Sequence, residues 1–427
     1  MYLFLYMSKI NLVAADMGYG HQRAAYPLLA LSKQGTINLN DYEGISQSER
    51  TYWANTLKSY EKISYFKKIP LLGSLVFKAM DHFQKIQPFY PKRPLGEQTF
   101  QQKMFLREIK KGLGKGLIER LGKESEVLPF VTTFFVAAYC AEYYNYPGDI
   151  YCIVCDADIS RAWAPIEPKK SKIKYLAPNE RVRERLKMYG VSSGNIFVTG
   201  FPLPEENIAT LKADLAKRLV SLDPLEAFRS SFSPLLSGLD LPINAGRAFS
   251  LTFAVGGAGA QREIGGKILE KLAPAIRDGN MRLNLVAGSR GDVKEYFTSL
   301  ANKESLVGNE NLNILYHPKK MEYFRQFNEC LRETDVLWTK PSELSFYSGL
   351  GLPILMSEPV GSQEEFNREW LLAIGAGMES DDPKFVNEWL LDWRRDGRLA
   401  RAAMNAYLLA PHSGTESIAQ IFNDDAL

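Results

Sequence analysis

The sequence has little cysteine, no long apolar run and almost no excess charge of either sign. Four cysteines in 427 residues are too few for a disulfide framework, and this usage fits a reducing compartment. No run reaches the roughly 18 residues needed to cross a bilayer, and the opening MYLFLYM lacks a basic region, so neither a transmembrane helix nor a secretory signal is expected. A net charge of +3 gives no argument for binding nucleic acid, and no such partner is expected.

Two of the cysteines, Cys152 and Cys155, form a C-x-x-C pair. Such a pair holds zinc when a second Cys or His pair completes the site, and none stands near it in the sequence. Both cysteines lie in the apolar run 151–155. The pattern therefore favours a buried strand.

The composition is that of a folded globular protein, with 45% hydrophobic and 24% charged residues, and the length indicates two domains. Short apolar runs alternate with helical patterns in two series, which predicts two doubly wound α/β halves with mostly parallel sheets. The expected strands are 10–15, 131–133, 149–155 and 195–199 in the first series, and 250–255, 282–287, 312–316, 336–339 and 353–356 in the second.

These series predict the domain boundaries. Residues 1–204 form the first domain and 248–385 the second. Between them, 205–247 contains three prolines and a charged, helical stretch, which is typical of a linker with an insertion. Residues 386–427 are expected to form terminal helices that pack across the two domains.

The segment 52–93 differs from the rest in composition. It carries eight Lys or Arg, only two acids and nine aromatic residues, and apolar residues recur at helical spacing from Leu71 to Ile86. Such a helix could lie on an anionic membrane surface. Alternatively, its apolar stripe packs on the sheet.

Two glycine-rich turns each join an expected strand to an expected helix. They are Gly18-Tyr19-Gly20-His21 and Gly256-Gly257-Ala258-Gly259. Backbone amides in such turns, at the positive end of the helix dipole, favour phosphate or developing negative charge. The first turn lacks the third glycine of a dinucleotide fingerprint, and the second lacks the Lys-Ser/Thr of a P-loop, which weakens both of those interpretations.

His21 is one of only four histidines and is expected at the mouth of the first sheet, where open α/β folds bind ligands. An imidazole there could take a proton from an attacking hydroxyl. The alternative is a histidine that only hydrogen-bonds the turn.

Two polar loops follow strands of the second half. One holds Lys340, Ser342 and Glu343, and the other ends in Gln363-Glu364-Glu365-Phe366-Asn367. Both are expected to converge near Gly256, where their hydroxyl, amide and carboxylate groups suit a polyhydroxylated ligand with a phosphate, as in a sugar nucleotide. Taken singly, each could instead cap a helix N-terminus.

Six motifs occur in one order over most of the chain. They are GYGHQRAA (18–25), VCDADISRAWAP (154–165), VTGFPLP (198–204), GGAGAQ (256–261), TKPSEL (339–344) and VGSQEEFN (360–367). Together they resemble the GT-B glycosyltransferases, in the branch of the peptidoglycan GlcNAc transferase, plant monogalactosyldiacylglycerol synthase and bacterial processive diacylglycerol glucosyltransferases.

The resemblance implies two Rossmann-like domains that face each other across a catalytic cleft, an N-terminal acceptor domain and a C-terminal nucleotide-sugar domain. It implies inverting transfer of a hexose from a nucleotide-sugar co-substrate, expected to be a UDP-sugar, with no cofactor and no required metal. His21 or Asp156 would help to deprotonate the acceptor hydroxyl, beside the phosphate or acceptor loop of Gly18, Tyr19 and Gly20.

The same resemblance implies which residues bind the donor. The diphosphate would leave into the amides of the Gly256 loop and its helix dipole. Sugar hydroxyls would be held by the loop after the last strand. The implied donor-binding residues are Gly256, Gly257, Ala258, Gly259, Gln261, Lys340, Ser342, Glu343, Gln363, Glu364 and Asn367.

In the membrane-active relatives, the segment corresponding to 52–93 is basic and amphipathic. This implies a cytoplasmic protein that is peripheral on the inner face of a membrane, with a lipid or lipid-linked acceptor. With a soluble acceptor, the same residues would form a lid.

One departure from the family affects the donor site. The family loop has Gly-Gly after Lys-Pro and then a Ser-Glu whose carboxylate holds the ribose, whereas this chain has Ser342-Glu343 directly after Lys-Pro and no such later Glu. Glu343 could reach the same hydroxyls, or donor use has changed or been lost. Two alternatives therefore stand beside the transferase: a non-catalytic GT-B-like binding protein and a UDP-sugar 2-epimerase.

Overall fold

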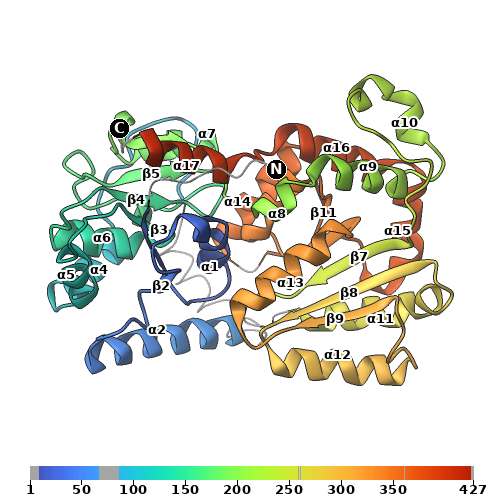
Figure 1. The fold of residues 1–427 in the computed structure, drawn as a ribbon, viewed down its shortest axis with the longest axis horizontal. Coiled ribbons are helices and arrows are strands. Elements are labelled where there is room, and N and C mark those ends of the chain that lie inside the picture. Colours follow the sequence, from blue (N-terminus) through green and yellow to red (C-terminus); the bar gives the residue numbers. More distant parts are fainter. Residues whose placement is uncertain (1–8, 67–85, 258, 260, 360, 425–427) are drawn as a thin grey trace. The chain divides into compact units, whose positions relative to one another are not determined.

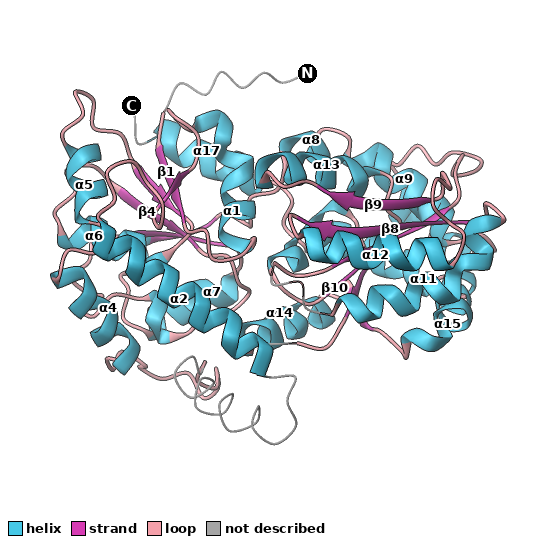
Figure 2. Cartoon of the chain, turned by 90° about the horizontal axis from the view of Figure 1, so that it is seen from below, coloured by secondary structure: helices cyan, strands magenta, loops and turns pink. Residues whose placement is uncertain are grey.

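The computed structural model of the protein describes residues 9–66, 86–257, 259, 261–359 and 361–424. These residues form two compact units, each built on a six-stranded sheet (Figures 1 and 2). Unit 1 consists of Met1–Pro202, Val360–Phe366 and Ser413–Leu427, and unit 2 consists of Leu203–Pro359 and Asn367–His412.

The sheet of unit 1 has the strand order β2-β1-β3-β4-β5-β6, and every neighbouring pair is parallel. Strands covered on both faces are apolar throughout, and accordingly every residue of β1, β3 and β4 is buried. The strands are β1 (Asn11–Ala14), β2 (Ile37–Asn38), β3 (Phe130–Thr132), β4 (Ile150–Ile153), β5 (Lys174–Ala177) and β6 (Ile196–Val198).

Helices of unit 1 pack on this sheet. The last of them, α17, returns from the end of the chain and places Phe422 against Tyr151 of β4, with ring centroids 5.0 Å apart. The helices of unit 1 are α1 (Gly20–Ala25), η1 (Tyr26–Leu31), α2 (Gln47–Phe66), α4 (Phe100–Lys110), α5 (Lys115–Gly122), α6 (Phe135–Tyr143), η2 (Arg161–Trp163), α7 (Glu180–Met188), η3 (Ser193–Asn195) and α17 (Gly414–Asp424).

The sheet of unit 2 has the order β12-β11-β10-β7-β8-β9 and is also parallel throughout. Its central strand β7 is buried along its whole length. The strands are β7 (Phe249–Ala254), β8 (Met281–Gly288), β9 (Leu312–Tyr316), β10 (Val336–Thr339), β11 (Ile354–Met356) and β12 (Gly377–Glu379).

The helices of unit 2 enclose a second hydrophobic core, to which Trp338 and Trp389 contribute. Helix α14 begins in the residues grouped with unit 1 and continues into unit 2. The helices are α8 (Glu205–Ile208), α9 (Leu211–Leu222), α10 (Ala227–Ser231), η4 (Ser233–Leu236), α11 (Arg262–Arg277), α12 (Gly291–Lys303), α13 (Lys320–Arg332), η5 (Glu343–Leu350), α14 (Ser362–Ala373), η6 (Pro383–Phe385), α15 (Val386–Arg395) and α16 (Arg398–Leu409).

The segment 205–247 folds as part of unit 2. Leu215 and Leu219 of α9 are fully buried in the core of that unit. The buried guanidinium of Arg218 donates to the carbonyl oxygens of Thr334 and Leu350 at 2.7 Å each. Because a buried cation must find acceptors, this residue fixes α9 against the loops after α13 and η5.

All nine strands expected from the sequence are present, with ends that agree to within a few residues. Three further strands, β2, β5 and β12, complete the sheets. The amphipathic helix expected from Leu71 to Ile86 lies outside the described residues, apart from Ile86. Within the part of the chain that the structure describes, no helix combines the length and apolarity needed to span a bilayer.

Candidate functional site

His21 lies in the first turn of α1, directly after the glycine turn that follows β1. Gly18 has φ +122°, a backbone conformation that residues with a side chain rarely adopt, so glycine is needed there for this turn. The ring nitrogen Nδ1 of His21 lies 2.6 Å from the carbonyl oxygen of Thr133, just after β3, and the Thr133 hydroxyl donates to the His21 carbonyl at 2.9 Å. Two reciprocal hydrogen bonds thus fix the histidine between neighbouring strands.

The hydrogen bond to Thr133 determines the tautomer of His21. A carbonyl oxygen only accepts, so Nδ1 carries the proton, and the neutral ring then has an acceptor lone pair on Nε2. The ring packs on Phe134 in an edge arrangement, with centroids 4.9 Å apart, and lies 6.5 Å from Trp163. His21 is therefore an oriented imidazole with aromatic neighbours.

Asp156 and Asp158 follow β4 and have different environments. Asp158 is buried, and its carboxylate pairs with Arg181 and Arg185 at 2.8 Å each. Two guanidinium groups satisfy it, so Asp158 anchors the loop. Asp156 is half-buried at the carboxyl end of β4, and β1, β3 and β4 are neighbours in the sheet, which places it at the same edge as His21.

The backbone around Trp163 is held in place by two tyrosine side chains from outside this loop. The Trp163 carbonyl accepts from the hydroxyl of Tyr175 at 2.7 Å, and the adjacent Ala162 carbonyl accepts from Tyr139 at 2.5 Å. Burial raises the pKa of both tyrosines well above the ordinary value, so they remain neutral donors. The loop that carries Asp156 is therefore rigidly fastened to the sheet. Within the described ranges, no three His, Cys, Asp or Glu side chains gather into a metal-binding group.

In unit 2, the loops after β7, β10 and β11 meet. A Cβ added to Gly256 would lie 2.7 Å from Cε of Lys340, so the lysine side chain passes directly over this glycine. The side-chain amide of Gln261 donates to the carbonyl oxygen of Glu358 at 2.9 Å. Gln261 is the N-cap of α11 and has φ +67°, which ends the glycine loop at the positive end of a 16-residue helix.

The segment that departs from the family lies largely inside unit 2. Ser345 to Ser348 are buried in η5, where Phe346 packs on Trp370 with centroids 5.0 Å apart. Glu343 opens η5 and is half-buried, as is Ser342 before it. Glu343 is the one carboxylate between residues 339 and 350, so a carboxylate contact from this loop has to come from it.

The last loop is divided between the two units. Asn367 is fully buried in unit 2 and donates from its side-chain amide to the Pro341 carbonyl at 3.3 Å, so it supports the Lys340 loop. Gln363 and Glu364 lie in the first turn of α14, in the residues grouped with unit 1. Ala258 falls outside the described residues.

Two residues that the sequence analysis did not single out lie at these loops. Thr133 orients His21, and its only sequence signal is its place at the end of an expected strand. Arg290 follows β8, and a Cβ on Gly259 would lie 3.8 Å from its Nε, which places a guanidinium beside the glycine loop. Arg290 is paired with Asp292 at 2.9 Å, and a polar residue after Gly288-Ser289 was the available signal.

Comparisons with known proteins address the fold. A family model described as a domain of unknown function (DUF6938) matches residues 289–406. No curated protein matches the sequence. Among solved structures, the UDP-GlcNAc 2-epimerase from Neisseria meningitidis bound to UDP-GlcNAc is 13% identical, with 97% of this chain and 100% of that chain covered and a TM-score of 0.50.

The fold is GT-B. MurG of Acinetobacter baumannii is 11% identical, with 97% of this chain and 99% of that chain covered and a TM-score of 0.49. The spinosyn rhamnosyltransferase SpnG is 13% identical, with 97% of this chain and 99% of that chain covered and a TM-score of 0.42. The two parallel six-stranded sheets and the likeness to the epimerase from Neisseria meningitidis support the GT-B architecture of two Rossmann-like domains, and at 13% identity this likeness concerns the fold alone.

Proposed function

We propose that the protein is an inverting glycosyltransferase that moves a hexose from a UDP-sugar to the hydroxyl group of a lipid or lipid-linked acceptor. Unit 1 would bind the acceptor and unit 2 the nucleotide-sugar. The orientation of His21 carries this proposal. A histidine that only closed the turn would not need its ring fastened from a second strand, whereas a general base needs a fixed tautomer.

In the proposed reaction, Nε2 of His21 accepts the proton of the acceptor hydroxyl as its oxygen attacks the anomeric carbon. The new glycosidic C–O bond forms on the face opposite the breaking bond between that carbon and the phosphate oxygen, and UDP leaves with the bonding electrons. Asp156, at the same sheet edge, would stabilise the imidazolium that results. One proton moves and one bond replaces another, so no redox partner is needed.

The donor side would stabilise the charge on the departing diphosphate. The amides of the Gly256 loop stand at the N-terminus of α11. The side chain of Lys340, which comes from the loop after β10, packs over Gly256 and brings its ammonium group close to these amides. These groups supply positive potential from the protein itself, so we propose a reaction that requires no metal ion and no cofactor. Ser342 and Glu343 would contact the nucleoside, while Gln363 and Glu364 would hold sugar hydroxyls.

The lipid acceptor is proposed from the composition of residues 52–93, whose basic and aromatic side chains suit an anionic membrane surface. A UDP-sugar 2-epimerase is the second candidate, because the fold is shared with the Neisseria meningitidis epimerase. An epimerase needs no acceptor, whereas a non-catalytic binding protein turns over neither substrate.

The testing experiment incubates the purified chain with UDP-glucose, UDP-galactose or UDP-GlcNAc, with and without diacylglycerol vesicles and in excess EDTA. Release of UDP that depends on the vesicles, persists in EDTA and yields a glycolipid supports the proposal. Interconversion of free UDP-sugar without vesicles would instead identify an epimerase. Absence of UDP binding by calorimetry would leave the binding-protein alternative.

A further inference from the structure

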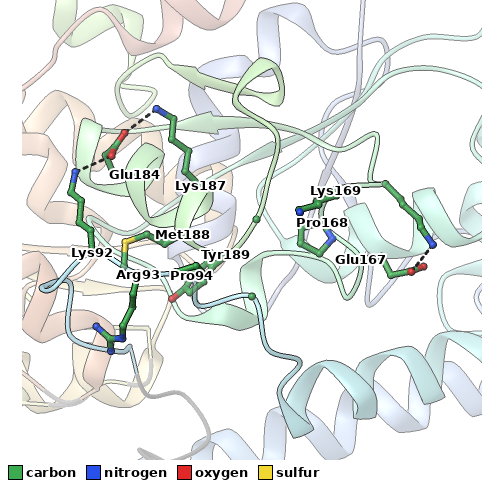
Figure 3. Close-up of a pocket in the computed structure, with 13 residues that line it drawn as sticks. Lys92, Arg93, Pro94, Glu167, Pro168, Lys169, Glu184, Lys187, Met188 and Tyr189 are labelled. Carbon is green, nitrogen blue, oxygen red and sulfur yellow. Dashed lines mark hydrogen bonds and ion pairs between the residues drawn. The ribbon is translucent and has the colours of Figure 1, made fainter.

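Unit 1 contains a cavity between the C-terminal part of α7 and the loop before β5 (Figure 3). Its volume is about 790 Å³, within the usual range of small-molecule sites. Figure 3 shows Lys92, Glu184 and Lys187 on one side of it, and Pro168 and Lys169 on the other.

The cavity is distinct from the site around His21. Residues 187–190 end α7 and lead to the start of β6, and residues 167–170 precede the start of β5. Both groups therefore lie toward the amino ends of parallel strands. His21 lies at the carboxyl ends, where the proposed acceptor chemistry takes place.

The charges around the cavity are unequal. Five cationic side chains line it against two carboxylates, Glu167 and Glu184. Glu184 is shared by Lys92 and Lys187, with both nitrogen–oxygen distances 2.9 Å, and these hydrogen bonds lower the pKa of Glu184 to about 2. One carboxylate thus serves two ammonium groups, which leaves an excess of positive charge.

Two further cations at the cavity have hydrogen-bonding capacity left over. Lys169 makes no ion pair or hydrogen bond with any residue that the structure describes. Arg93 uses Nη1 for the carbonyls of Pro88 and Pro91, while its Nη2 and Nε have no acceptor among the described residues. A guanidinium and an ammonium group together are a typical pair for a phosphate.

The wall that carries Arg93 is a built structure. Residues 86–96 lie along α7, and Phe89 is buried beneath the guanidinium of Arg181, whose central carbon is 3.9 Å from the ring centroid. The Leu95 amide donates to the Met188 carbonyl at 2.7 Å, and Arg161 donates to the Gly96 carbonyl at 3.1 Å. Together with the Lys92–Glu184 ion pair and the burial of Ile86, these three contacts hold the segment 86–96 in place.

We propose that this cavity binds a phosphate-bearing ligand. Arg93 and Lys169 would contact anionic oxygens of this ligand, and the side chains of Met188 and Tyr189 would cover an apolar part of the same molecule. The phosphate could belong to a lipid headgroup, since residues 92 and 93 end the basic segment, or to a small soluble metabolite. The site is independent of the proposed transferase activity.

The test uses the full chain with two kinds of probe. Calorimetric titration with inorganic phosphate and glycerol 3-phosphate measures a soluble ligand. Sedimentation with vesicles of phosphatidylcholine, alone or with roughly a third phosphatidylglycerol, measures a lipid headgroup. Arg93→Gln and Lys169→Gln are compared with Lys123→Gln, which removes the same charge from an exposed position of unit 1 outside the cavity.

Binding of either probe that weakens about fivefold or more in both cavity variants and is unchanged in Lys123→Gln supports the site. Loss confined to glycerol 3-phosphate identifies a soluble ligand, and loss confined to the anionic vesicles identifies a headgroup. Absence of binding to every probe, or an equal loss in Lys123→Gln, overturns the proposal. Thermal melting of each variant confirms that it is folded, and unchanged UDP binding separates this cavity from the donor site.

Discussion

Single residues define the chemistry proposed for unit 1. His21 is 112 positions from Thr133 in the sequence, yet the two exchange hydrogen bonds because β1 and β3 are neighbours. Asp158 differs from His21: it lies two positions from Asp156, but its carboxylate forms ion pairs with Arg181 and Arg185 and so has a structural role. The local environment separates a candidate base from a structural acid.

Replacing His21 by Ala is expected to lower kcat by about 100- to 10,000-fold, because the acceptor hydroxyl loses its proton acceptor. The Kd for UDP is expected to stay unchanged, since the groups proposed to bind UDP, around Gly256, Lys340 and Glu343, lie in unit 2. Steady-state kinetics and calorimetry measure the two quantities. His317→Ala, which removes a half-buried imidazole from unit 2, is the control, and equal activity of the His21 and His317 variants would remove His21 from the mechanism.

The buried cysteines predict a pH dependence of stability. Burial raises the pKa of Cys140 and Cys152 far above the ordinary value of 9.0. Above that value the unfolded chain loses thiol protons that the native chain keeps, so stability falls as the pH rises. For each thiol we expect a loss of about 1 kcal/mol between pH 9 and 10, with a slope that approaches about 1.4 kcal/mol per pH unit above pH 10.

Urea unfolding at several pH values measures this slope, and Cys152→Ala is expected to halve the part that the two thiols contribute. In the same native protein, neither thiol should react with a thiol reagent until urea is added. Rapid reaction of Cys152 in the native state would contradict the buried-strand environment and reopen a role for the C-x-x-C pair.

At the scale of elements, the ends of parallel strands assemble the proposed donor site. The loops after β7, β10 and β11 are far apart in the sequence, and the sheet order β11-β10-β7 brings them together. Lys340 reaches Gly256 because β10 and β7 are adjacent, and Gln261 reaches Glu358 because the strands that precede them, β7 and β11, are separated only by β10. After β10, residues 344–350 are buried, so the polar side chains of this loop that reach the surface are those of its first residues, Ser342 and Glu343.

Gly256→Ala is expected to weaken UDP binding about tenfold without unfolding the protein. The new methyl group would overlap Cε of Lys340, and a flexible side chain can move aside, but it then leaves the position proposed for the diphosphate. Calorimetry with UDP and near-UV circular dichroism measure affinity and folding. Gly194→Ala, at a glycine with no atom within 4 Å of an added Cβ, is the matched control. Unchanged affinity in Gly256→Ala would place the phosphate elsewhere.

At the scale of the whole molecule, each unit has a hydrophobic core of its own among the described residues, and the core of unit 1 is divided into two clusters. The chain leaves unit 1 at residue 202, and apart from 360–366 it returns to that unit only at 413, so that α17 completes the core of unit 1. Two cores with separate packing favour two unfolding transitions rather than one.

At a concentration of about 100 times its Kd, UDP is expected to raise the free energy of unfolding of unit 2 by about 2.7 kcal/mol and to leave that of unit 1 unchanged. Phe422→Ala should lower the free energy of unfolding of unit 1 alone, by about 3–5 kcal/mol, because this buried ring packs on Tyr151. Differential scanning calorimetry resolves both. Phe385→Ala, at a ring that is 55% exposed, is the control. A single transition that moves with both changes would mean that the units unfold together.

The sequence by itself determined nine of the strands and the glycine turns, because apolar runs such as 150–153 bury both faces and the backbone at Gly18 needs glycine. The sequence analysis did not predict β2, β5 or β12: β2 has only two residues, and β5 and β12 carry Lys174 and Glu379 within runs of four and three residues. Only the tertiary structure decided that Thr133 orients His21, that Lys340 covers Gly256 and that Arg93 and Lys169 share a cavity. Each of these contacts joins residues far apart in the chain, and the order of strands and the packing of helices, not local propensity, set which of them meet.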